Sequence, residues 1–91
     1  MKKAVRVYIF GIVQGIFFRA FIKEEAIKLG LNGYARNKDD GSVEAWFEGN
    51  SGDVDKMIER CKQGPSHSQI KRLDIIEEKV QGMKEFKVIR F

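Results

Sequence analysis

The sequence predicts an α+β fold in which two helices cover one face of an antiparallel sheet. Segments dense in Val, Ile, Tyr and Phe indicate strands, two segments carry apolar residues at helical spacing, and glycine-containing turns separate them. In chain order these give strand, helix, strand, strand, helix, strand, with a short extra strand at the end. We expect residues 1–91 to form one domain, because a chain of 91 residues can build one hydrophobic core but not two.

The first strand is predicted at residues 3–10, where Val and Ile alternate with Arg, Tyr and Phe. Apolar residues lie on both of its faces near the end, which indicates a central position in the sheet. The first helix is predicted at residues 20–29, and Gly30 provides its C-terminal stop. Its apolar face, at offsets of three and four, consists of Phe18, Phe21, Ile22, Ala26 and Leu29.

The next two strands are predicted to form a hairpin. They occupy residues 31–37 and 43–48, and the Asp-Gly pair within residues 38–41 is a strong turn signal. On the second of these strands, Glu44 and Glu48 share the face opposite the apolar residues. We therefore expect that face to be exposed, in a sheet covered on one side only.

The second helix is predicted to open at residues 50–53, whose side chains are suited to cap it. Its apolar stripe consists of Val54, Met57, Ile58 and Cys61, which is typical of core packing. The Gly-Pro pair at residues 64–65 ends the helix. Residues 70–79 are predicted as a strand whose irregular alternation indicates a bulge, and residues 85–91 as the extra strand. This order is the ferredoxin-like, or split βαβ, arrangement, which hosts many functions.

Composition narrows the function classes. The net charge of +4 is modest, without a run of five or six like charges, and favours anionic partners in general. The single cysteine, Cys61, rules out an internal disulfide and fits a reducing compartment. Together with one histidine, His67, it offers no paired ligand spacing, so we expect no metal site. No run of about 18 apolar residues occurs, so we expect no membrane span and a cytoplasmic protein.

The link between the first strand and the first helix, residues 11–19, is the main candidate site. A glycine-bounded link into a helix can direct several backbone N–H groups toward one anion, at the positive end of the helix. Arg19 adds a planar fork of donors that suits phosphate oxygens. The stretch is not a Walker loop, because Ile16 and Phe17 follow its last glycine. The alternatives are a tight turn with structural glycines and an arginine on the surface.

Two stretches resemble the acylphosphatase family. Residues 11–19 resemble the family pattern Gly-x-Val-Gln-Gly-Val-x-Phe-Arg, with Ile16 in place of the second Val. Residues 33–37 resemble the pattern Gly-Trp-Val-Arg-Asn, and the Gly-Pro pair at residues 64–65 matches a further landmark. The resemblance covers nearly the whole chain in order. Its other departures, which leave the polar positions intact, are Tyr34, Ala35 and Ser68.

The resemblance implies an enzyme that hydrolyses the carboxyl–phosphate bond of small acyl phosphates. It implies that Arg19 binds the substrate phosphate and that Asn37 orients the attacking water. Inorganic phosphate is then a product and an expected inhibitor, and no metal or organic cofactor is expected. The backbone N–H groups implied to bind the phosphate are those of Val13, Gln14, Gly15, Ile16, Phe17 and Phe18.

The chemistry of acyl phosphates agrees with this residue set. The leaving group is a carboxylate, whose conjugate acid has a pKa of about 4, so it departs without a proton donor. A site without histidine or paired carboxylates is therefore adequate, because phosphoryl transfer needs mainly positioning and charge stabilisation. Asn37 has an alternative interpretation, because Asn before Asp-Asp-Gly is an ordinary turn former.

Two other functions are compatible with the predicted fold. RNA-recognition domains share the element order but need exposed aromatic residues on the central strands. Here Glu44 and Glu48 flank Trp46, and we expect their carboxylates to repel nucleic acid. The second alternative is a domain of the same family without enzymatic activity. The presence of both Arg19 and Asn37 favours an active enzyme.

Overall fold

The computed structural model describes residues 1–14, 16–66 and 68–89. The elements are β1 (Lys2–Ile12), α1 (Ile16–Lys28), β2 (Asn32–Asn37), β3 (Val43–Asn50), α2 (Ser51–Gln63), β4 (Gln69–Glu78) and β5 (Phe86–Ile89). The predicted α+β, ferredoxin-like order is confirmed, with β5 as the extra strand. The part of the last strand predicted at residues 90–91 lies outside the described residues.

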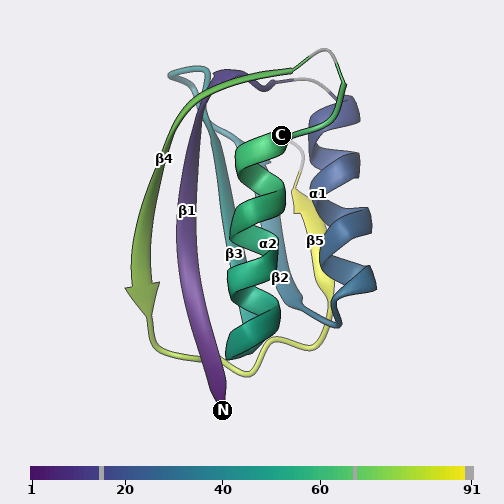
Figure 1. Ribbon diagram of the computed structural model, residues 1–91, viewed down its shortest axis with the longest axis vertical. Coiled ribbons are helices and arrows are strands. Elements are labelled where there is room, and N and C mark those ends of the chain that lie inside the picture. The colour runs from purple at the N-terminus through teal and green to yellow at the C-terminus, as the bar shows by residue number, and fades with distance from the viewer. Residues whose placement is uncertain (15, 67, 90–91) are drawn as a thin grey trace.

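The five strands form one sheet in the order β4-β1-β3-β2-β5. The pairs among the first four strands are antiparallel, whereas β5 joins β2 in a parallel pair, so the sheet is mixed. Both helices lie on the same face of the sheet (Figure 1). Helix α1 packs on β2 and β5, and α2 packs on β1 and β3. Among the described residues, neither helix is long and apolar enough to cross a membrane.

The core lies between the helices and the sheet. Alternate β1 residues face it, and the helical stripes predicted from the sequence supply the other side. The buried core includes Val5, Val7, Ile9, Phe18, Ile22, Ala26, Val54, Met57 and Cys61. Burial raises the pKa of the Cys61 thiol to about 12, so this cysteine behaves as a small apolar core residue rather than a nucleophile.

The opposite face of the sheet differs from the prediction. Glu44 and Glu48 are only 5% and 4% exposed, so the expectation of a solvated face was wrong at these positions. Glu44 accepts hydrogen bonds from the Tyr34 hydroxyl and from Arg36, whose Nη2 lies 2.8 Å from Glu44 Oε1. Alternation identified which residues share a face, but it could not show that their neighbours would cover them.

Glu48 is covered by the chain that follows β4. Its carboxylate accepts hydrogen bonds from Trp46 Nε1 at 2.9 Å, from the Gln81 backbone N–H at 3.0 Å and from the Met83 backbone N–H at 2.8 Å. Burial alone would raise the pKa of Glu48, but these hydrogen bonds outweigh it and hold the pKa below the usual 4.5.

Candidate active site

Several connections meet at one end of the sheet, at the top of Figure 1. They are the β1–α1 link (residues 13–15), the β2–β3 turn (residues 38–42) and the α2–β4 connection (residues 64–68). Strand β5 also ends there (Figure 1). The fold therefore brings the predicted phosphate-binding stretch to the same end as Asn37, the last residue of β2.

Gly11 belongs to β1 rather than to the link, because β1 continues to Ile12 against β4. The pairing register shifts between Phe10 and Gly11, which confirms the predicted irregularity in β4. Gly11 has φ +140°, and a Cβ at this position would lie 1.9 Å from the Gln69 carbonyl oxygen. Glycine is required here because the two backbones approach closely.

Helix α1 begins at Ile16, not at Ala20 as predicted. The aromatic run after Ile16 has the composition of a strand, but burial of Phe18 against the core holds it as the first helical turn. The first N–H groups of a helix have no partner within it and lie at its positive end. The N–H groups of Ile16, Phe17 and Phe18 therefore form a helix N-terminus. Those of Val13 and Gln14 belong to the link, and Gly15 lies outside the described residues.

The Gln14 side chain ties the link to the β2–β3 turn. Its Nε2 donates to the Lys38 carbonyl oxygen at 2.7 Å and to the Ser42 carbonyl oxygen at 3.1 Å. These two carbonyls stand at the ends of the turn that follows Asn37. Sequence reasoning gave Gln14 only a backbone role and missed this contact, because nothing in the chain marks a partner 24 or 28 residues away.

The turn after Asn37 has its own internal bonds. The Lys38 N–H donates to the Ser42 carbonyl oxygen at 2.8 Å. Asp40 Oδ1 accepts from Ser42 Oγ at 2.6 Å and from the Ser42 N–H at 2.9 Å, and these bonds lower the pKa of Asp40. The turn that follows Asn37 is thus held by hydrogen bonds to Asp40, which belongs to the turn, and by hydrogen bonds from Gln14, which belongs to the β1–α1 link.

Arg19 reaches the same end of the sheet from α1. Its Nη1 donates to the Ile89 carbonyl oxygen at 3.4 Å, and Ile89 is the β5 partner of Arg36, the residue before Asn37. Among the described residues, neither Arg19 Nε nor Asn37 Oδ1 has a hydrogen-bond partner, although both atoms are buried. Such atoms are rare, because leaving one unpaired costs about 1–3 kcal/mol.

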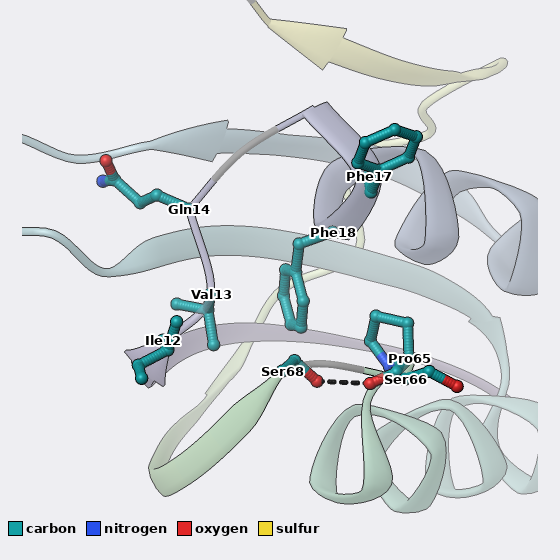
Figure 2. Close-up of a pocket in the computed structure, with 8 residues that line it drawn as sticks. All are labelled: Ile12, Val13, Gln14, Phe17, Phe18, Pro65, Ser66 and Ser68. Atoms are coloured by element: carbon teal, nitrogen blue, oxygen red, sulfur yellow. Dashed lines mark hydrogen bonds between the residues drawn. The ribbon is translucent and has the colours of Figure 1, made fainter.

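An apolar pocket of about 220 Å³ lies on another side of the link, and Figure 2 shows it. Its walls include Ile12, Val13, Phe17 and Phe18 on one side and Pro65, Ser66 and Ser68 on the other. Ser68 Oγ donates to the Pro65 carbonyl oxygen at 2.6 Å and so closes the α2–β4 connection. The Gln14 side chain points away from the other residues drawn (Figure 2).

A comparison with known families decides the identity. The family model for acylphosphatase matches residues 5–88. The chain belongs to the acylphosphatase family. It is 48% identical over 82 residues to an acylphosphatase of Syntrophus aciditrophicus, a match that covers 90% of this chain and 85% of that one.

Solved structures agree with this membership. The crystal structure of acylphosphatase from Bacillus subtilis matches with a TM-score of 0.93 and 32% identity, covering 99% of this chain and all of that one. A structure of full-length HypF in a phosphate- and nucleotide-bound form matches with a TM-score of 0.88 and 31% identity, but this chain covers only 12% of it. Acylphosphatases are hydrolases that act on small acyl phosphates, so the predicted family and enzyme class are confirmed.

In this acylphosphatase-family chain, Arg19, Asn37 and the described part of the β1–α1 link lie at one end of the sheet. Asn37 ends a strand, and Arg19 is the fourth residue of a helix, so both are held by regular elements. Within the described residues, no three His, Cys, Asp or Glu side chains cluster as metal ligands would. His67 lies outside the described residues.

Proposed function

We propose that this chain hydrolyses the carboxyl–phosphate bond of acyl phosphates, giving a carboxylate and inorganic phosphate. One observation supports this most directly. Within residues 1–14, 16–66 and 68–89, Arg19 Nε and Asn37 Oδ1 are buried without hydrogen-bond partners, and Arg19 is the fourth residue of α1. A bound phosphate and a water molecule would satisfy these two atoms, since the first is a donor and the second an acceptor.

The phosphate is held by backbone and side chain together in this proposal. The N–H groups of residues 13–18 surround it, those at the start of α1 adding the positive end of the helix. Arg19 supplies a full positive charge and a donor geometry that matches phosphate oxygens. Helix α1 holds the N–H groups of residues 16–18 and the backbone of Arg19 in regular structure, which suits them to stabilise the charge that develops on the phosphoryl oxygens.

The attacking water is positioned by Asn37 in this proposal. The Asn37 carbonyl oxygen accepts a hydrogen from water, while its amide nitrogen donates to a phosphate oxygen. The bridging oxygen leaves with the carboxylate when its bond to phosphorus breaks. Since a carboxylate needs no protonation at neutral pH, the site requires no general acid.

Phosphate release from benzoyl phosphate, measured with and without chelator, tests this proposal. In this proposal, backbone amides and Arg19 stabilise the charge on the phosphate, and no metal ion is required. Turnover should therefore be unchanged by chelator. Inorganic phosphate should inhibit competitively, because it occupies the same donors. Loss of activity that magnesium or zinc restores, or purely noncompetitive inhibition by phosphate, would contradict the proposal.

Nucleic acid is not a partner in this proposal, for a reason that differs from the expected charge repulsion. Trp46 is buried under the Arg6 guanidinium, whose carbon lies 5.4 Å from the ring centre, and it stacks on Tyr34. Its ring is therefore covered and cannot stack on a base. For the location, the single cysteine supports our proposal of the cytoplasm.

A further inference from the structure

We propose that the apolar pocket beside the β1–α1 link binds the acyl group of the substrate and selects uncharged, aryl-sized acyl groups. This inference rests on the proposed function, because it takes the phosphate to be held by residues 13–18 and Arg19. It adds the substrate class, which the phosphate site alone does not determine. Three observations support it: the position of the pocket, the chemistry of its walls and its size.

The position follows from the strand order. The β1–α1 link leaves β1, which has β4 on one side and β3 with β2 on the other. Asn37 lies at the end of β2, whereas the wall residues Pro65, Ser66 and Ser68 belong to the connection that leads into β4. Gln14 also lines the pocket, but its side chain bonds to the turn beyond Asn37 and points away from the other lining residues (Figure 2). The link therefore separates Asn37 from the pocket.

Phosphoryl transfer places the attacking and leaving oxygens in line, on opposite sides of phosphorus. Water positioned by Asn37 approaches from the β2 side of the link. The carboxylate must then depart toward the β4 side, where Pro65, Ser66 and Ser68 line the pocket together with the described residues of the link. The acyl group, which is attached to that carboxylate, is thus directed into the pocket by the geometry of the reaction.

The walls of the pocket suit an uncharged group. Phe17 is 84% exposed and Ile12 is 62% exposed, so two large apolar side chains at the rim face water. An apolar acyl group would cover them, which is favourable because apolar surface is removed from water. Among the described residues that line the pocket, no side chain is charged, and the hydroxyl of Ser68 already donates to the Pro65 carbonyl oxygen. An acyl group with a second carboxylate would find no counter-charge there.

The size of the pocket suits an aryl ring. An apolar cavity of about 150 Å³ is large enough to hold benzene. The pocket here has a volume of about 220 Å³ and opens to solvent at its rim. It can therefore hold a benzoyl group, while an acetyl group would leave most of it unfilled.

Binding of two phosphonates by calorimetry tests the inference independently of turnover. Phenacylphosphonate and acetonylphosphonate carry a methylene in place of the bridging oxygen of benzoyl and acetyl phosphate, so neither is hydrolysed. The wild-type chain should bind the phenacyl compound about tenfold or more tightly, because part of a buried ring contributes on this scale. The Ile12→Ser and Phe17→Ala variants should each reduce this ratio to about threefold or less.

The matched control is Ile27→Ser, which removes a side chain of 58% exposure from α1 outside the pocket. It should leave the ratio unchanged, and Ile12→Ser should retain wild-type affinity for acetonylphosphonate. A wild-type ratio near one, or an equal fall in all three variants, would overturn the pocket assignment. Tighter binding of a succinyl-type phosphonate than of the phenacyl compound would also overturn it. Hydrolysis of acetyl phosphate, measured separately, reports on the proposed function, so the two failures are distinguishable.

Discussion

Two groups of buried polar atoms in this protein differ in how many hydrogen-bond partners they have. On the face of the sheet away from the helices, Glu48 accepts one indole and two backbone hydrogen bonds. At the end of the sheet, Arg19 Nε and Asn37 Oδ1 have no partner among the described residues. The first group holds the fold together, and the second carries a cost that a ligand can remove. Exceptions to polar satisfaction of this kind are expected at functional sites.

Arg6 Nε, a third buried atom that has no hydrogen-bond partner in the described part of the chain, sharpens this contrast. It lies in the same layer as Glu44 and Glu48, but carboxylates surround its guanidinium. Arg6 Nε is 3.9 Å from Glu44 Oε2, and Arg6 Nη2 is 3.4 Å from Glu78 Oε2. Arg19 has no such carboxylate partner in the described part of the chain. A partly buried guanidinium whose Nε lacks a partner and a nearby counter-charge among the described residues is suited to bind an anion.

Replacing Arg19 with Ala should have the largest effect on catalysis. In the proposed mechanism its charge interacts with the phosphate in both the ground state and the transition state, so turnover should fall by about 10³-fold or more and phosphate inhibition should weaken. Thermal unfolding should show no loss of stability, because only one long hydrogen bond disappears with the side chain. Unchanged phosphate affinity in this variant would contradict the assignment of Arg19.

Replacing Asn37 with Ala should lower the catalytic constant by roughly 10²- to 10³-fold, the scale expected when one preorganised polar group is lost. Phosphate affinity should change much less, since the amides and Arg19 remain. Steady-state kinetics combined with phosphate inhibition separate the two quantities, and circular dichroism reports on folding. If this variant instead lost phosphate binding and kept normal turnover of bound substrate, Asn37 would be a binding residue.

Replacing Glu48 with Ala tests the opposite side of the comparison. Three donors lose their acceptor, so the free energy of unfolding should fall by about 3 kcal/mol, which for a chain of this size corresponds to roughly 10–20 °C in Tm. Activity per folded molecule should remain, because Glu48 lies far from the site end of the sheet. A variant as stable as the wild type would show that water replaces the carboxylate at no cost.

Replacing Gln14 with Ala should have a smaller effect on activity, with turnover falling by about tenfold. The link and the turn after Asn37 lose their two shared hydrogen bonds, so Asn37 is positioned less well. Gln63→Ala is the matched control, because it removes an exposed glutamine at the end of α2. If Gln14→Ala lowered stability but left turnover unchanged, the Gln14 contact would be structural only.

Periodicity was sufficient to predict the architecture, because the chain is short and its apolar stripes are regular. The motifs singled out Arg19 and Asn37 as candidate site residues, and both lie at one end of the sheet, but their roles stay predictions. Periodicity could not predict that Glu44 and Glu48 would be buried, since it assigns residues to a face without showing what covers that face. Residues 81–83, which cover Glu48, have no periodic pattern of their own.

Two local features near the site could not be predicted from the sequence either. The start of α1 was placed too late, because Ile16 and the phenylalanines after it have the composition of a strand as much as that of a helix. The Gln14 side chain contacts a turn that is remote along the chain, and only the folded sheet brings the two together. In both cases a tertiary contact decided what local propensity left open.

The smallest expected effect is the pH dependence of stability that is due to Glu48. Its pKa is lower in the folded protein than the usual 4.5, so the folded state binds the proton more weakly than the unfolded state does. Glu48 therefore stabilises the fold above about pH 4.5, and this contribution is lost as the pH falls through the lower, folded-state pKa.

Urea unfolding of the wild type and of Glu48→Gln across pH 3–7 isolates the contribution of Glu48 to stability, because the glutamine cannot titrate. The difference in unfolding free energy should be constant at neutral pH and should shrink below pH 4.5. A difference that grows in acid would mean that burial, not the three hydrogen bonds, dominates the pKa of Glu48.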